Sequence, residues 1–185
     1  MKLTPIIAAL RSRCPRFENR VGGAAQFKAI PEAGKLKLPA AYVVPSEDVA
    51  GENRSQTDYW QDLTEGFSVI VVLSNERDEK GQWASSDAVH DVRGELWKAL
   101  LGWEPYPEAH EIVYAGGMLL ELNRYELYYQ FDFTVKYEIT EEDTRQQDDL
   151  DALSELKTLS IDVDYIEPGG GPDGNIEHHT EISFP

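Results

Sequence analysis

The longest regular pattern in the sequence is an alternation of apolar and polar side chains between Leu127 and Ile139. Side chains of a β-strand point alternately to its two faces, so the pattern predicts a strand with one apolar and one wet face. Because this strand is longer than the usual ~5–6 residues, we expect it to bend or to continue outward and pair with a neighbouring subunit. The chain therefore has to contain a sheet.

Further strands are predicted on both sides of this one. Phe67 to Leu73 (FSVIVVL) is almost wholly apolar and β-branched, which is typical of a central strand covered on both faces. Shorter apolar runs predict strands at 40–44, 112–114, 118–122 and 161–165, with a turn near Asn123. Residues 111–139 have the order expected of an antiparallel set.

Two helices are predicted from apolar residues at helical spacing, over 4–14 and 87–101. Thr4 and Ser86 are the expected N-caps, and Gly102 fits the position after the second helix. Gly94 costs that helix about 1 kcal/mol relative to Ala, which predicts a close contact there. The fold class is therefore α+β: a mixed, largely antiparallel sheet with two main helices packed on it, plus a C-terminal β extension.

The single cysteine, Cys14, lies on the apolar stripe of the first helix, where we expect a buried small side chain rather than a nucleophile. One cysteine cannot form an intramolecular disulfide, so the chain is not built for an oxidising compartment. No targeting segment or membrane-spanning apolar run is visible, and we expect assembly in the cytoplasm.

Charge is distributed unevenly along the chain. The formal net charge is −17, which excludes binding of duplex DNA through clustered Lys and Arg. Residues 1–45 carry eight Lys and Arg against two Asp and Glu, whereas residues 141–185 carry two against thirteen. Such ends complement each other between packed copies, although an acidic tail that only confers solubility explains the pattern equally well.

Catalytic motifs are absent from the sequence. It contains no phosphate-binding loop, no dinucleotide fingerprint and no nucleophile elbow. The adjacent His178 and His179 would point to opposite faces of a strand and cannot readily chelate one ion. Asp162 and Asp164 share a strand face and are the only weak candidates for Mg²⁺, although a solvated strand face explains them better.

Seven side chains are the candidate assembly contacts. The polar segment 46–64 is predicted to be a long loop, and loops of this length are usually functional or disordered. Its aromatic residues are expected to pack on a partner or on their own chain. The final segment, 175–185, is predicted to be a peripheral strand on a glycine-rich tether. The candidates in these two segments are Glu52, Arg54, Tyr59, Trp60, Ile176, Ile182 and Phe184.

Five segments resemble the tail terminator, or tail completion, proteins of long-tailed bacteriophages, including lambdoid and Mu-like forms. They are MKLTPIIAALRSRCPRF, PAAYVVPSEDVAGEN, Phe67 to Leu73, AVHDVRGELWKALLGW and LYYQFDFTVKYEI. The resemblance covers a domain at residues 1–140. Residues 141–185 form an acidic extension beyond it, with a strand and the tethered tail.

The resemblance implies a structural virion protein without enzymatic activity or cofactor. Such proteins form a hexameric ring that caps the tail tube, ends its polymerisation and offers a docking surface to the head connector. The implied partners are further copies of the chain, the tail tube protein and the head–tail connector protein. Genome DNA would pass through an acidic channel without specific binding, and the protein would lie in the tail at the head–tail junction.

Two alternatives stay open at this point. Another head–tail adaptor or minor tail protein would also form rings, but it would bind the connector without stopping tube growth. A carboxylate-metal nuclease would require Asp162 and Asp164 to converge with a third acid.

Overall fold

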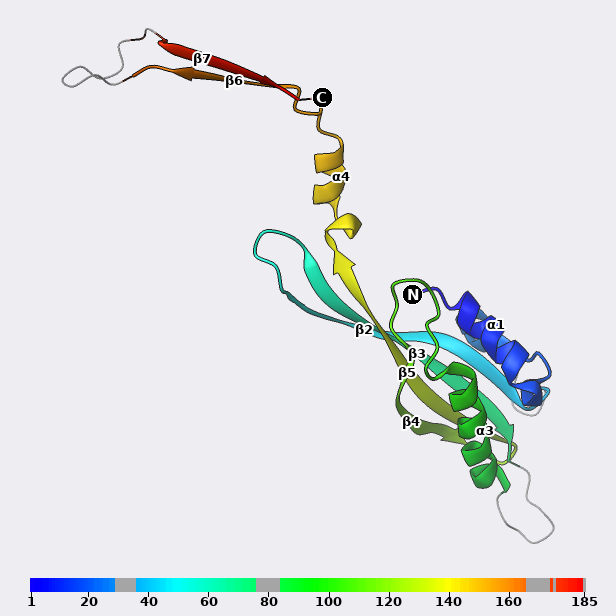
Figure 1. Ribbon diagram of the computed structural model, residues 1–185. Helices are drawn as coiled ribbons and strands as arrows, with labels where there is room; N and C mark the ends of the chain where they lie inside the picture. Colours follow the sequence, from blue (N-terminus) through cyan, green and yellow to red (C-terminus); the bar gives the residue numbers. More distant parts are fainter. Residues whose placement is uncertain (29–35, 76–83, 166–173, 175, 185) are drawn as a thin grey trace. The chain divides into compact units, whose positions relative to one another are not determined.

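The computed structural model describes residues 1–28, 36–75, 84–165, 174 and 176–184 (Figure 1). They fall into two compact units, the core unit Met1–Glu141 and the C-terminal unit Glu142–Pro185. The core unit contains, in order, α1 (Thr4–Arg13), η1 (Pro15–Phe17), β1 (Val21–Gly23), α2 (Ala24–Lys28), β2 (Ala40–Asn53), β3 (Trp60–Ser74), α3 (Ala84–Leu100), β4 (Val113–Leu122), β5 (Glu126–Thr140) and η2 (Glu141–Asp143), which reaches into the next unit. The C-terminal unit adds α4 (Arg145–Asp151), β6 (Thr158–Val163) and β7 (His178–Ser183).

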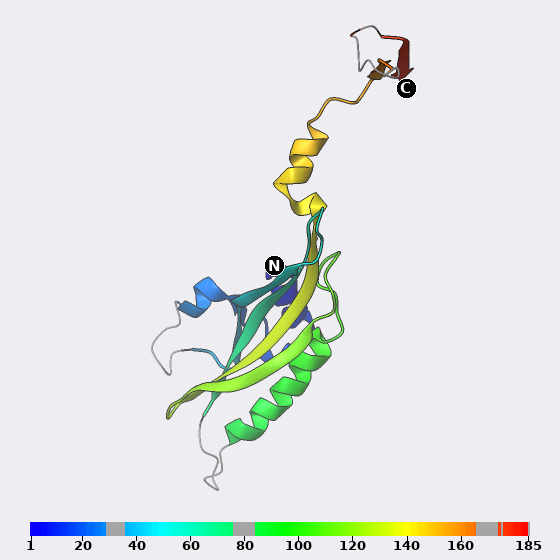
Figure 2. The ribbon, with the colours of Figure 1, turned by 90° about the vertical axis from the view of Figure 1, so that its left-hand side faces the viewer.

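The core unit is built on a five-stranded sheet in the order β1-β2-β3-β5-β4. The β1–β2 pair is parallel, and all other neighbours are antiparallel. Helices α1 and α3 lie together on one face of the sheet, and α2 lies on the other side (Figures 1 and 2). The predicted α+β fold class is confirmed, including the β extension of the C-terminal unit.

Strand β3 is the central strand, as the apolar run from Phe67 to Leu73 predicted. On the helix-covered face Phe67 stacks on Phe133 with ring centroids 5.3 Å apart. On the other face Val72 joins a smaller cluster with Ala40 and Tyr42, packed against Phe27 and two leucines. Both faces of β3 are thus buried, and the core side chains pack against one or the other of them.

The helices bury the stripes that their spacing predicted. Ile6, Leu10 and Cys14 are fully buried where α1 meets the sheet and α3. Burial raises the pKa of the Cys14 thiol from 9.0 to about 11, and the nearby Glu95 carboxylate adds to the shift. The thiol is therefore a packing group, as predicted.

Three local predictions about the helices are wrong. The N-cap of α1 is Leu3 without a side-chain hydrogen bond, so Thr4 does not cap it. Helix α3 begins at Ala84, which places Ser86 inside the helix. A Cβ on Gly94 would meet no described atom within 4 Å, so no close contact explains this glycine. Gly102, with φ of 72°, does end the helix as predicted.

Residues 46–64, predicted as a long loop, are mostly strand. β2 continues to Asn53 and β3 begins at Trp60, so only residues 54–59 form the connection. The segment is extended because β5 runs out to Thr140 and pairs with β3 along its whole length, from Ser74–Glu126 to Trp60–Thr140. The long strand β5 therefore supports an arm, defined here as residues 46–65 and 136–140, which continues beyond the part of the sheet covered by helices (Figure 1).

In its described residues, the C-terminal unit contains one short α-helix and one hairpin. Thr144 caps α4 by accepting a hydrogen bond from the Gln147 amide. β6 and β7 pair antiparallel, with Thr158 opposite Ser183 and Val163 opposite His178. The predicted terminal strand is thus present as half of a hairpin, whereas the predicted glycine tether falls at residues outside those described. No helix in the described ranges is long and apolar enough to cross a membrane.

Candidate assembly surfaces

Four of the seven candidate residues meet at the tip of the arm. The amide oxygen of Asn53 accepts hydrogen bonds from the Ser55 and Trp60 backbone amides at 3.1 and 3.0 Å, which closes the turn. The Arg54 guanidinium lies 5.6 Å above the Trp60 ring and forms an ion pair with Asp62. The tip is therefore an ordered structure held by its own side chains.

The other side chains of the tip are also fixed locally. The Tyr59 hydroxyl donates to Gln61 Oε1 at 2.7 Å, and the Gln61 amide donates to the Gly51 carbonyl at 2.6 Å. Tyr59 and Trp60 remain 36% and 46% exposed, and Glu52 is exposed beside them. The tip thus presents aromatic surface that its own contacts do not cover.

The three remaining candidates belong to the C-terminal unit. Ile182 lies within β7, and Ile176 and Phe184 lie just before and just after this strand. All three are exposed. They stay predicted contacts.

The outer edge of β4 is a surface that the sequence prediction missed. No strand of the described part of the chain pairs with that side of β4. Five large apolar side chains of β4 are between 41% and 58% exposed; this apolar edge comprises Val113, Met118, Leu119, Leu120 and Leu122. An open, apolar edge strand is a template for pairing with another chain. The available signal was the unalternated run Met118–Leu119–Leu120 beside two glycines.

The opposite edge of the sheet is closed. Arg11 donates through Nε and one terminal nitrogen to the Val21 carbonyl, at 3.0 and 2.6 Å. Gln26 accepts from the Gly23 amide at 3.1 Å. Side chains thus occupy the outer backbone groups of β1, a common protection against edge-to-edge pairing. The two edges of the sheet therefore differ: the β4 edge is open to pairing, whereas the β1 edge is occupied by side chains.

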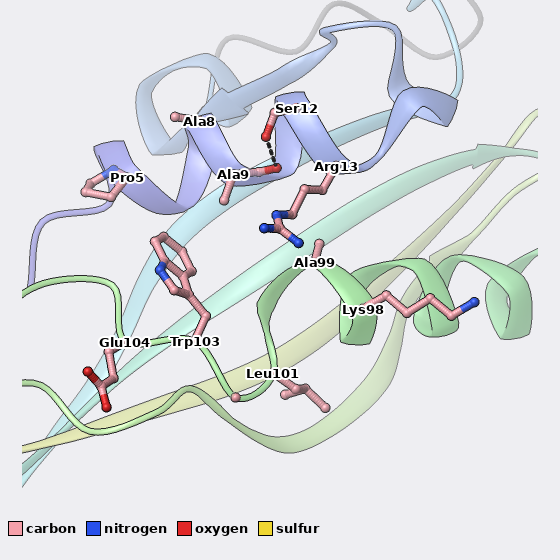
Figure 3. Close-up of a pocket in the computed structure, with 11 residues that line it drawn as sticks. Pro5, Ala8, Ala9, Ser12, Arg13, Lys98, Ala99, Leu101, Trp103 and Glu104 are labelled. Atoms are coloured by element: carbon pink, nitrogen blue, oxygen red, sulfur yellow. Dashed lines mark hydrogen bonds between the residues drawn. The ribbon is translucent and has the colours of Figure 1, made fainter.

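A groove of about 1010 Å³ lies between α1 and the end of α3 (Figure 3). Trp103 stands in it facing α1, and Arg13 reaches from α1 toward Ala99. Lys98 points away along α3, so the two cations do not converge on one point. The Ser12 hydroxyl is used within its own helix, donating to the Ala9 carbonyl at 3.0 Å. The polar side chains that line the groove are accordingly not arranged around one point.

A buried polar cluster ties the start of α1 to the base of the arm. The Met1 ammonium forms an ion pair with Glu65 inside the protein, and the Tyr106 hydroxyl donates to the same carboxylate at 3.1 Å. Burial, followed by the negative charge of Glu65, raises the pKa of Tyr106 far above 10. These groups satisfy one another, which is the arrangement of a structural cluster.

The carboxylates considered for metal binding do not form such a site. Asp162 pairs with His179 across the β6–β7 hairpin, and Asp164 accepts from the Gly174 amide at 2.8 Å. Within the residues that the structure describes, no group of three or more His, Cys, Asp or Glu side chains can hold a metal ion. The third acid that a nuclease would require is not found among them.

The described residues thus form an α+β core unit with one open strand edge and a projecting arm. The sequence matches the model of the phage tail terminator protein family over residues 1–145, and the chain belongs to that family. Members of this family are structural rather than enzymatic, and the family places the protein in the virion tail. A comparison with curated proteins finds no match.

Proposed function

We propose that the protein forms a ring that caps the phage tail tube, ends its polymerisation and provides the surface on which the head connector docks. The observation that carries the proposal is the family match, which spans the whole core unit. The ring lies at the head–tail junction and contains six copies. Its partners are further copies of the chain, the tail tube protein and the connector protein.

The asymmetry of the sheet supports association around a ring. A heterologous interface joins two different surfaces of identical subunits, and it closes into a ring when the rotation between copies fits. The core unit has one protected edge at β1 and one open apolar edge at β4. Because the β1 edge is closed, β4 in a head-to-tail ring would meet a different surface of the next copy, and this difference between surfaces is what a heterologous interface requires.

The arm supports contact with a further component of the tail. Its tip is ordered by internal hydrogen bonds yet exposes the rings of Tyr59 and Trp60. Exposed aromatic residues on a rigid support are typical of interface anchors. We assign this tip to the tail tube protein. The net charge of −17 also supports a channel that repels DNA phosphates and lets the genome pass.

The test is an assay of tube length. Purified tail tube protein is polymerised with and without this protein, and the lengths are measured in negative-stain images. Capping predicts shorter tubes that carry a ring at one end, and Trp60→Ala is expected to weaken this effect while Glu47→Gln leaves it unchanged. Unregulated tubes together with binding to purified connector would instead identify an adaptor.

A further inference from the structure

The two exposed rings at the tip of the arm point to opposite sides of it. Adjacent residues of a strand face opposite ways, so Gln61 and Asp62 of β3 lie on different faces. Tyr59 belongs to the Gln61 face, because its hydroxyl donates to Gln61 Oε1 at 2.7 Å. Trp60 belongs to the Asp62 face, because Arg54 lies over its ring and pairs with Asp62. The tip therefore carries one aromatic ring on each face.

Each face continues below its ring with aliphatic surface. Val49 lies opposite Thr64, on the Trp60 face, and is 54% exposed. Ala50 lies opposite Leu63, on the Tyr59 face, and is also exposed. This part of the sheet continues beyond the helices of the core unit (Figure 1). Both faces of the arm are thus open to contact with a partner.

The tip is also acidic. Glu52 and Asp58 are exposed there, and Glu138 of β5 lies opposite Asp62. Arg54 offsets only Asp62, because the two side chains form an ion pair. Negative charge thus lies around the two rings, and such a surface attracts a cationic partner and repels an acidic one.

The chain's own C-terminal unit has the wrong charge to cover this surface. Residues 141–185 carry two Lys and Arg against thirteen Asp and Glu, so they share the negative sign of the tip. The arm cannot fold back onto the core unit either, because β3 and β5 pair as far as the row of Trp60 and Thr140. The tip is therefore available to a different chain.

Internal hydrogen bonds hold both faces in place before any partner binds. The Gln61 amide donates to the Gly51 carbonyl at 2.6 Å, and Asn53 closes the turn through the Ser55 and Trp60 amides. Side chains that are fixed in advance lose less conformational entropy on binding. The tip is thus suited to enter a preformed recess.

We infer that the arm inserts into a cleft of the tail tube protein, that this cleft contacts both faces of the arm, and that cationic side chains line it. A flat docking surface would contact only one of the two rings. The inference rests on the proposed function, which assigns the tip to the tube protein, and adds the shape and the charge of the surface that receives it.

The experiment compares the two faces by cross-linking from adjacent residues of β2. Val49→Cys and Ala50→Cys each carry a cysteine-reactive photo-cross-linker and are assembled on tail tubes. Insertion predicts that both positions link to tube protein, at different peptides identified by mass spectrometry. Ala25→Cys, at an exposed position of α2, is the control and is expected to link to tube protein several-fold less. Cys14 is fully buried and stays unlabelled.

Affinity and rate measurements test the rings and the charge separately. Tyr59→Ala and Trp60→Ala are each expected to raise the Kd for tube ends at least about tenfold, because each removes an aromatic anchor. Tyr59→Phe keeps its ring and is expected to stay within about threefold of the unsubstituted protein. Glu52→Gln with Asp58→Asn is expected to slow association about three- to tenfold at low salt, and much less at about 0.5 M salt. Circular dichroism of each variant verifies that the core unit is folded.

Links from only one of the two β2 positions, or an unchanged affinity of Tyr59→Ala, would overturn the insertion while leaving the proposed function intact. Links to another copy of this chain in place of tube protein would overturn it as well. Association that is equally fast for the charge variant at low salt would overturn the cationic lining. Tubes that grow to unregulated length with the unsubstituted protein would overturn the proposed function itself.

Discussion

The thiol of Cys14 makes the stability of the core unit depend on alkaline pH in a predictable way. Its pKa is raised from 9.0 to about 11 in the folded protein, chiefly by burial. Above pH 9 the unfolded chain loses this proton first, so the stabilisation is fully present below pH 9 and is lost as pH rises toward 11. Linkage gives a loss of about 1.3 kcal/mol in the free energy of unfolding between pH 8 and pH 10.

The assay is urea unfolding under reducing conditions, followed by tryptophan fluorescence at pH 8, 9 and 10. Cys14→Ala is the comparison, because it keeps the buried tyrosines that also titrate at high pH. At pH 8 the variant is expected to be less stable by about 1–2 kcal/mol, owing to the cavity left behind. By pH 10 this difference is expected to shrink by about 1.3 kcal/mol. A difference that stays constant across the pH range would refute the account of a desolvated thiol.

Three further substitutions test the packing and the arm. Phe133→Ala removes a fully buried ring stacked on Phe67 and is expected to lower the free energy of unfolding by about 3–5 kcal/mol, measured by urea unfolding. Glu65→Gln leaves the buried Met1 ammonium without its counter-charge and is expected to lower the free energy of unfolding by about 3 kcal/mol in the same assay. An equally strong loss of stability for Glu47→Gln, at an exposed position, would contradict this reasoning. Gly66→Ala would place a Cβ 2.8 Å from the Glu47 carbonyl. It is expected to displace the base of the arm, to lower the free energy of unfolding by about 1–3 kcal/mol and to change the fluorescence of Trp60. Gly51→Ala is the control and should be tolerated, because its Cβ would lie 3.5 Å from the nearest described atom.

The sequence predicted those parts of the fold that depend on burial. The alternation in β5 and the apolar run in β3 identified strands whose side chains fill the core. The stripe Val92, Leu96 and Leu100 identified the buried side of α3. In each case these side chains are buried in the core, and the spacing of apolar residues along the sequence indicates directly which side of the element is buried.

The arm was not predictable in the same way. Residues 46–53 and 60–64 are largely polar. Residues 60–64 are extended because β5 provides hydrogen-bond partners as far as Thr140, and residues 48–53 pair in turn with β3. Strand formation there depends on a segment more than 70 residues away in the chain, whereas a local pattern reports only nearby residues. The candidate residues Arg54, Tyr59 and Trp60 lie together at the tip of the arm, although the segment that carries them was expected to be a loop.

The apolar edge was missed for a related reason. The run from Met118 to Leu122 was predicted to be a strand, but the sequence of a strand does not indicate whether it pairs with one or with two neighbouring strands. Only the strand order, with β4 last, turns these apolar side chains into an exposed surface. A surface of this kind is seen once the topology is known.

Native mass across a range of protein concentrations, followed by class averages of negative-stain images, tests the central claim most directly. The account predicts a species of six times the 20.9 kDa chain mass and six-fold rings, either alone or when tail tubes are added. A protein that stays monomeric at every concentration, forms no ring on tubes and leaves their length unregulated would contradict it.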